Sequence, residues 1–301
     1  MKGVKMKVLT KVTKAFLKII FGIALLFSIF FVYLEFDSRV PNNDKISKVN
    51  NSLLIGAFNI QILGESKMSK SDVVASLVET LSRYDIVLIE EIRDKKGEAI
   101  VKLLYRLNMA TGNKYNLIIS NRLGNSNSKE QYAFIYDKNK VKVIDSYNFL
   151  DIGNHFEREP FSVKFKYEDN DFILVGVHID PDLVFDELSE LSIALKYISI
   201  YLADEDLVLM GDLNADCNYI NDKKLKSLVL FKNYNWLIDS LVDTTVSKTD
   251  CAYDRIITSE SLLFRAKNPN VYHFDEEQNL NNKKAKRVSD HYPVEFLLDF
   301  N

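Results

Sequence analysis

Short apolar runs that end in polar residues constrain this chain more than any other feature. The run Leu207–Met210 has the length of a buried strand and is followed at once by Gly211, Asp212, Leu213 and Asn214. Glycine breaks a strand, and alternate residues of an extended segment face the same side, so Asp212 and Asn214 point together. Such a pair suits one metal ion or one phosphate oxygen. A local turn is the alternative, because Gly, Asp and Asn are also turn residues.

The same arrangement recurs along the chain. Polar clusters follow or lie beside other strand-like runs, at Asn59, Glu90-Glu91, His178, Asp254 and Asp290-His291. Because neighbouring strand residues face opposite sides, only one of Glu90 and Glu91 can point into a shared site. Carboxylates, amides and histidines gathered in this way are expected of metal-assisted hydrolysis of a phosphoester.

The order of elements predicts an α+β fold. Helical spacing of apolar residues predicts helices at 69–84, 95–107 and 183–202, whereas the charged segment 279–287 is expected to be a loop. Strands outnumber helices, and early strand-helix-strand patterns mix with hairpin-like pairs. We therefore predict two packed mixed β-sheets flanked by helices in a domain at 52–301, with catalytic residues along one edge.

The N-terminal residues predict a membrane anchor. Residues 1–18 hold six lysines and no acidic residue, and residues 19–34 are uncharged and mostly bulky and apolar. With the four residues before it, this segment reaches roughly the 20 residues that a spanning helix needs. The positive-inside rule then puts residues 1–18 in the cytoplasm and the domain outside, after a polar linker at 35–51. A cleaved signal peptide, and hence a secreted protein, is the alternative.

Net charge bears on the choice of partner. The chain has 39 basic and 42 acidic residues, and because six of the basic residues lie in the N-terminal segment, the remainder is distinctly acidic. An acidic domain is poorly suited to nucleic acid unless bound divalent cations offset part of its field. We therefore expect that binding of a polyanion would depend on metal. No obligatory protein partner is indicated.

Cys217 and Cys251 are the only two cysteines. Two thiols can be unrelated buried residues, but an exported domain with only two cysteines favours one disulfide. Each cysteine lies beside one of the polar clusters. A bond between them would tie the loop after Asp212 to the strand that carries Asp254.

Seven motifs together resemble one known family. They are AFNIQILGE, DIVLIEEIRD, KEQYAFIY, FEREPFSVKF, GDLNADCNY, CAYDRI and SDHYPVE, and the resemblance they carry covers residues 53–300. The set resembles deoxyribonuclease I, within the endonuclease/exonuclease/phosphatase superfamily. The resemblance implies the four-layer sandwich of that family and a DNA substrate, whose phosphodiester bonds would be hydrolysed with little sequence specificity to leave 5′-phosphates.

The resemblance also implies roles for two histidines. His178 is similar to one member of the pair that acts as general acid and base, with Glu130 similar to its carboxylate partner. His291 is similar to the other member, and Asp254 to its partner. The chemistry agrees, because a histidine near its ordinary pKa exchanges protons and a carboxylate on its other nitrogen fixes the tautomer.

Further ligands follow from the same motifs. Glu91 is similar to the principal metal-binding carboxylate, for Mg²⁺ or Mn²⁺, in a metal and phosphate pocket with Asn59, Asp212, Asn214 and Asp290. A structural Ca²⁺ site is implied in an extended loop, where alternate residues present oxygen to one side, although a polar surface loop is equally consistent with its sequence. Its residues are Asp243, Thr245, Ser247 and Thr249.

Arg93 and Arg158 are similar to arginines that contact DNA in the family, the first in the minor groove and the second at a phosphate. Ser128 stands where the family has a tyrosine that packs against a sugar. Two other functions stay open from the sequence alone. One is a phosphodiesterase or phosphatase of the same fold that acts on a phospholipid head group or nucleotide, and the other is a surface protein without enzymatic activity.

Overall fold

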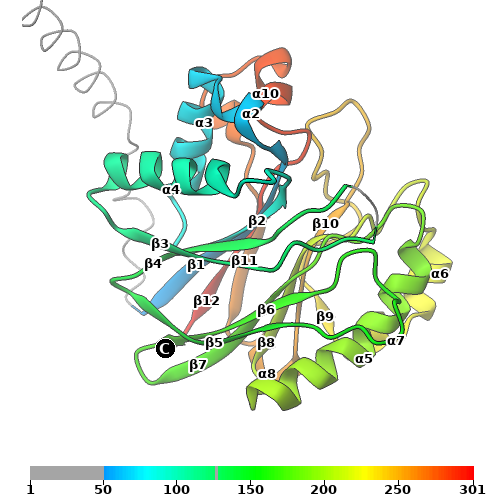
Figure 1. The fold of residues 1–301 in the computed structure, drawn as a ribbon. Coiled ribbons are helices and arrows are strands. Elements are labelled where there is room, and N and C mark those ends of the chain that lie inside the picture. Colours follow the sequence, from blue (N-terminus) through cyan, green and yellow to red (C-terminus); the bar gives the residue numbers. More distant parts are fainter. Residues whose placement is uncertain (1–50, 126–127) are drawn as a thin grey trace, which may run out of the picture. The chain divides into compact units, whose positions relative to one another are not determined.

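The computed structural model describes residues 51–125 and 128–301 of the chain. These residues form two six-stranded β-sheets that pack against each other, with helices on their outer faces (Figure 1). Most neighbouring strands run antiparallel, but each sheet contains one parallel pair, so both sheets are mixed. The prediction of two packed mixed sheets flanked by helices is confirmed.

The first sheet has the strand order β11-β12-β1-β2-β4-β3. Its strands are β1 (Ser52–Leu63), β2 (Ile86–Ile92), β3 (Tyr115–Ile119), β4 (Ala133–Asp137), β11 (Ala266–Val271) and β12 (Val294–Asp299). The helices on its side are α2 (Glu65–Met68), α3 (Ser71–Leu81), α4 (Glu98–Thr111), α9 (Phe274–Glu277) and α10 (Asn282–Val288).

The second sheet has the strand order β5-β6-β7-β8-β10-β9. Its strands are β5 (Val141–Asn148), β6 (Phe161–Tyr167), β7 (Asn170–Gly176), β8 (Leu207–Asp212), β9 (Asn235–Trp236) and β10 (Asp254–Thr258). The helices on its side are α5 (Val184–Leu202), α6 (Asp222–Ser227), α7 (Val229–Asn233) and α8 (Glu260–Leu263).

The parallel pairs decide where the polar clusters meet. β1 and β2 run parallel with α3 between them in the chain, and β7 and β8 run parallel with α5 between them. The carboxyl ends of parallel neighbours lie at the same edge of a sheet. The antiparallel strands β4, β10 and β12 begin at these same edges. Residues at the carboxyl ends of β1, β2, β7 and β8 are therefore brought together with residues at the amino ends of β4, β10 and β12.

The core lies between the sheets and under α5. Phe134 of β4 packs against Phe161 and Phe165 of β6, with ring centroids 6.0 and 5.9 Å apart. Leu88 of β2 is fully buried and fills the space left by Gly176 of β7, where a Cβ would lie 2.6 Å from its Cδ1. Burial of this apolar area holds the two sheets together.

The segment 279–287 differs from the prediction. The charged segment 279–287 is not a loop throughout, because α10 begins at Asn282. The side chain of Asn281 accepts a hydrogen bond from the N–H of Lys284, which caps the helix, and Ala285 and Val288 are buried. Two apolar contacts in so short a helix leave a weak periodic signal, which explains why the sequence pattern missed it.

The predictions for the N-terminal segment concern residues that the structure does not describe. The predicted transmembrane segment at 19–34 and all but the last residue of the linker at 35–51 lie outside the described residues. From residue 51 onward, apart from 126–127, the structure contains no helix that is long and apolar enough to cross a membrane.

Candidate active site

Asp212 lies at the centre of the predicted site. It is the last residue of β8 and is 2% exposed. The Nε2 atoms of His291 and His178 lie 3.5 and 3.6 Å from its Oδ2, and the amide of Asn59 donates to the same oxygen at 3.1 Å. His178 follows β7 of the second sheet, whereas Asn59 and His291 come from the first sheet. Side chains from both sheets therefore converge on one carboxylate oxygen.

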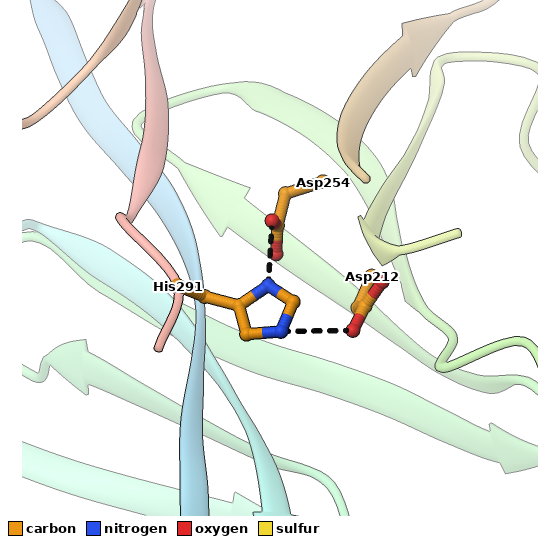
Figure 2. A group of neighbouring side chains, drawn as sticks. All are labelled: Asp212, Asp254 and His291. Carbon is orange, nitrogen blue, oxygen red and sulfur yellow. Dashed lines mark hydrogen bonds and ion pairs between the residues drawn. The ribbon is translucent and has the colours of Figure 1, made fainter. Parts of the chain in front are cut away.

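Each histidine has a carboxylate on its other ring nitrogen. The Nδ1 of His178 lies 3.0 Å from Oε2 of Glu130, and the Nδ1 of His291 lies 2.8 Å from Oδ2 of Asp254 (Figure 2). These carboxylates favour a proton on Nδ1 and leave each Nε2 directed at Asp212. The structure thus forms both predicted histidine–carboxylate pairs, and each ring is oriented to exchange a proton through Nε2.

The charges of the site depend on one another. Burial by itself lowers the pKa of His291, but the negative charges of Asp254 and Asp212 outweigh burial and raise this pKa well above its ordinary value. Burial raises the pKa of Asp212, but the charges of His291 and His178 outweigh that effect and lower it. At neutral pH His291 therefore holds a proton and Asp212 a negative charge.

Glu91 is held at the edge of the site by a distortion of β1. The register of β1 against β2 shifts between Asn59 and Leu63, and Ile62 has a φ of 55°. This turns the N–H of Ile62 toward Oε2 of Glu91 at 2.8 Å, while the amide of Asn59 donates to Oε1 at 3.3 Å. Glu91 itself has a φ of 57°, a conformation that costs free energy in a residue with a side chain.

Glu90 faces the opposite way and supports Asp212 from beneath. Its side chain is fully buried, and both of its carboxyl oxygens lie 3.1 Å from the backbone nitrogen of Asp212. Burial, together with the charge of Asp212, raises the pKa of Glu90 well above its ordinary value. Sequence alternation showed that only one of the two glutamates could enter the site, but gave no role to the other.

Several oxygen donors of the site suit a divalent metal. Asp212, Asp254 and His291 each offer an atom within 4.8 Å of the others. His291 and Asp254 already bond each other, so the carboxylates of Glu91 and Asp212, which the Asn59 amide bridges, are the more available ligands. Such a set of carboxylate oxygens fits Mg²⁺ or Mn²⁺.

The remaining two residues of the predicted pocket lie close by. Oδ1 of Asp290 is 3.9 Å from Nε2 of His291, and the Asp290 side chain is 46% exposed, which leaves it open to a ligand. Asn214 is buried, its N–H donates to Oδ1 of Asp212 at 3.1 Å, and its side-chain amide donates to the carbonyl of Ile179. All five predicted pocket residues are thus gathered at one edge.

Comparison with known proteins agrees with this geometry. A model of the Endonuclease/Exonuclease/phosphatase family matches residues 56–291. Deoxyribonuclease-1 of Equus caballus is 40% identical and that of Homo sapiens 38% identical, each over 82% of this chain and 92% of its own length. The chain belongs to this family. As a homologue of deoxyribonuclease-1 it is a phosphodiester hydrolase.

The family fold is also seen in solved structures. The human Nocturnin catalytic domain with bound sulfate matches with a TM-score of 0.58 and 16% identity, over 82% of this chain and 93% of that chain. At this identity the match shows the shared fold alone. The two-sheet arrangement described above is therefore the endonuclease/exonuclease/phosphatase fold.

The two arginines with family counterparts flank the pair of Glu130 and His178. Nη2 of Arg93 lies 3.5 Å from Oε1 of Glu130 and also bonds the hydroxyl of Ser128, and its side chain is 30% exposed. Arg158 is only 7% exposed, its Nε donates to the carbonyl of His178 at 3.0 Å, and its Nη1 lies 3.9 Å from Oε1 of Glu130. Arg93 is thus placed at the rim, whereas Arg158 lies mostly beneath the histidine.

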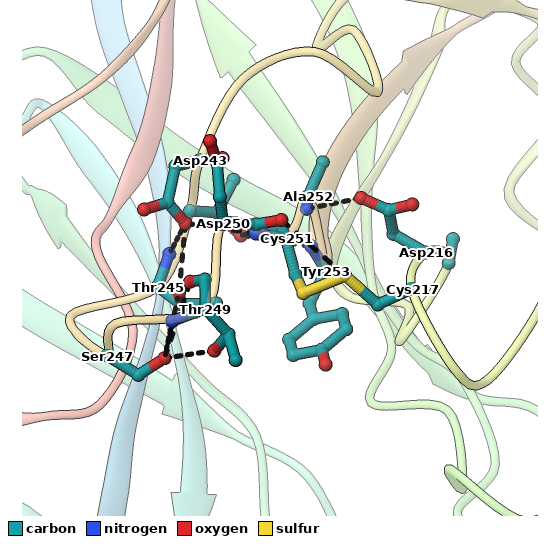
Figure 3. Close-up of a disulfide and its surroundings, with 12 residues drawn as sticks. Asp216, Cys217, Asp243, Thr245, Ser247, Thr249, Asp250, Cys251, Ala252 and Tyr253 are labelled. Carbon is teal, nitrogen blue, oxygen red and sulfur yellow. Dashed lines mark hydrogen bonds between the residues drawn. A yellow bond between two sulfur atoms is a disulfide. The ribbon is translucent and has the colours of Figure 1, made fainter.

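The disulfide between Cys217 and Cys251 is formed, as predicted, and joins the loop after β8 to the segment before β10 (Figure 3). Beside it, Oδ1 of Asp243 accepts hydrogen bonds from the N–H groups of Thr245 at 2.9 Å and Cys251 at 3.2 Å. The hydroxyls of Ser247 and Thr249 bond each other. The hydroxyl of Thr245 contacts both Asp243 and Ser247, so oxygens from all four residues of the predicted Ca²⁺ loop lie together. The Ca²⁺ site itself stays a prediction.

Proposed function

We propose that this protein is a metal-dependent endonuclease that hydrolyses DNA phosphodiester bonds with little sequence specificity and leaves 5′-phosphates. The observation that supports this most is the convergence of two histidines, each bonded to its own carboxylate, on Asp212. The 40% identity to deoxyribonuclease-1 supports DNA as the substrate.

The histidine pair provides the proton transfers of such a reaction. In-line attack of water on phosphorus needs a base for the water and an acid for the leaving oxygen. His178 and His291 present two Nε2 atoms beside one carboxylate, so one ring takes a proton while the other gives one. Glu130 and Asp254 stabilise the protonated form of each ring.

The neighbouring carboxylates and amides hold the metal and the phosphate. Glu91 would be the principal ligand of Mg²⁺ or Mn²⁺, with Asp290 and Asp212 beside it, and a metal held there would supply positive charge to offset negative charge on the phosphoryl oxygens. The amides of Asn59 and Asn214 line the same pocket. The oxygens gathered around Asp243 would hold a structural Ca²⁺, which would stiffen the loop next to the disulfide.

The enzyme acts outside the cytoplasmic membrane in this proposal. The apolar segment 19–34 holds the domain there, with the lysines of residues 1–18 on the cytoplasmic side. The disulfide supports this placement, because disulfides persist in oxidising compartments. Cleavage after the apolar segment would release the same domain as a secreted enzyme.

Plasmid nicking by the full chain tests the proposed function. Nicking is expected with Mg²⁺ plus Ca²⁺ and not with a chelator. Asp254→Asn is expected to lower kcat about 100-fold or more, because an amide no longer holds the productive tautomer of His291. Asp151→Asn is the matched control, since Asp151 bonds Nδ1 of the exposed His155 at 2.9 Å in the same way.

Two outcomes would contradict the proposal. Nicking by Asp254→Asn at the parent rate would refute the role of the His291 pair. A folded parent protein that binds Mg²⁺ but does not nick DNA would favour a phospholipid head group or a nucleotide as substrate, and release of phosphate from those compounds would identify it.

A further inference from the structure

Lys67 is a buried lysine that is not among the site residues described above. It lies in the short helix α2 and is 6% exposed. Its Nζ donates to two main-chain carbonyls, that of Ile60 at 2.5 Å and that of Val288 at 2.7 Å. A lysine in the interior is unusual, since burial of its charge costs free energy unless polar groups surround it.

The two carbonyls belong to the two segments that carry Asn59 and Asp290, both residues of the predicted metal pocket. Ile60 follows Asn59 at the distorted end of β1, and Val288 ends α10 two residues before Asp290. Ile60 and Val288 are 228 residues apart in the sequence. The Nζ of Lys67 donates a hydrogen bond to each of them. The lysine therefore fixes the separation of the two segments.

Ser289 makes a second link at the same place. Its hydroxyl donates to the carbonyl of Asn59 at 2.6 Å and accepts from the N–H of His291 at 3.0 Å. The end of β1 and the turn before β12 are thus joined by two side chains, and only that of Lys67 is charged.

The charge of Lys67 lies in the field of the predicted metal ligands. Burial lowers its pKa to about 8, against the opposing effect of the negative charges of Asp290 and Glu91. The ammonium group of Lys67 thus interacts electrostatically with both carboxylates in spite of the cost of burial.

We propose that Lys67 is a positioning residue of the active site. Through the carbonyls of Ile60 and Val288 it sets the distance between Asn59 and Glu91 on one side and Asp290 on the other, and thereby the spacing of the ligands for a divalent metal. This inference rests on the proposed function, since it assigns Lys67 to the metal pocket of that reaction.

Lys67→Met in the full chain tests the inference, because methionine has a similar length and shape but no N–H donor. Loss of a residue that orients metal ligands costs about 10–100-fold in metal affinity or activity. The Mg²⁺ concentration for half-maximal nicking should rise by about 10-fold or more and kcat should fall, with little change in KM for DNA. Lys67→Gln, which keeps donors on a shorter side chain, should give a smaller effect. Lys102→Met is the control, since Lys102 is exposed and pairs with the exposed Glu98 of the same helix, α4.

A second measurement separates this inference from the proposed function. The shift of the thermal midpoint on addition of Mn²⁺ reports metal binding without any DNA. The parent and Lys102→Met are expected to show the shift at the same Mn²⁺ concentration, and Lys67→Met only at a higher one. If the parent shows the shift but does not nick DNA, the proposed function fails while the Mn²⁺ titration still decides the role of Lys67.

A purely structural role gives a different result. In that case Lys67→Met would have a lower thermal midpoint but the parent Mn²⁺ dependence and the parent kcat per folded molecule, and the inference would be overturned. If Lys67→Met does not fold, Lys67→Leu, which also lacks an N–H donor, would overturn the inference equally if it kept the parent Mn²⁺ dependence.

Discussion

The peptide between Gly211 and Asp212 is the most constrained point of the site. Gly211 has a φ of 137°, which side chains rarely allow. A Cβ at this position would lie 2.0 Å from Oε1 of Glu90 and 2.2 Å from the carbonyl of Val177. The absence of a side chain thus lets Glu90 reach the backbone nitrogen of Asp212. The sequence pattern placed the end of the strand at this glycine, but β8 continues through Gly211 to Asp212, so the glycine serves packing rather than strand termination.

Gly211→Ala is therefore expected to lower the free energy of unfolding by about 2–5 kcal/mol, from backbone strain and overpacking together. Nicking should fall as well, because Asp212 would move. Urea unfolding measures the first effect. Gly64→Ala is the control, since Gly64 has an extended backbone and a Cβ there would meet no atom within 4 Å. Equal stability of the two variants would contradict the account of Gly211.

At the scale of elements, β8 and β10 hold the two carboxylates that contact His291. The strands are antiparallel neighbours in which Asp212 is paired with Asp254. The disulfide joins the loops that extend beyond this pair, with a sequence separation of 34 between Cys217 and Cys251. The ladder fixes the carboxylates, and the disulfide restrains the loops next to them.

Replacement of both cysteines by alanine should therefore affect stability more than catalysis. Loss of a cross-link of this length lowers the free energy of unfolding by about 3–4 kcal/mol in the chain-entropy model. Nicking well below the thermal midpoint should stay within about 3-fold of the parent, because the strand pairing remains. Guanidinium unfolding with and without a reductant measures the effect, and the reductant should destabilise the parent but not the double variant. A double variant with the same free energy of unfolding as the parent would contradict this expectation.

At the scale of the whole domain, the site depends on how the two sheets pack against each other, because each sheet supplies part of it. Asn59 and Glu91 come from the first sheet, and His178 and Asp212 from the second. Leu88 lies between the sheets against Gly176, two residues before Glu90. The packing of this leucine is thus coupled to the support of Asp212.

Leu88→Ala should lower the free energy of unfolding by about 2–5 kcal/mol through the cavity it leaves. Nicking should also fall in the folded protein, because the sheets would shift relative to each other. Leu241→Ala is the control, since Leu241 is 91% exposed and its loss should change stability by less than about 0.5 kcal/mol. Full activity of folded Leu88→Ala would show that sheet packing tolerates the cavity without moving the site.

Although strands β9 and β11 were not predicted, the sequence by itself determined most of the strands, the main helices and the chemical groups of the site. Each of these depends on residues close together in the chain: an apolar run and the polar residues after it, the period of a helix, or a motif such as Ser-Asp-His. The positions of Asp212, His178 and His291 at strand ends could therefore be predicted. The pairing of the only two cysteines followed from their number.

Only the tertiary structure decided how these groups face one another. Asn59 and Asp212 are 153 residues apart in the sequence, and their contact depends on how the two sheets pack. The same holds for the contact of Glu90 with the backbone nitrogen of Asp212. It also holds for Lys67, because its partners are main-chain carbonyls, which a pattern of side chains cannot reveal. Helix α10 also needed this context, because it is stabilised by a cap and by burial of Ala285 and Val288 rather than by its own periodicity. Local patterns record which groups are present, but distances between remote segments are set by packing of the whole domain.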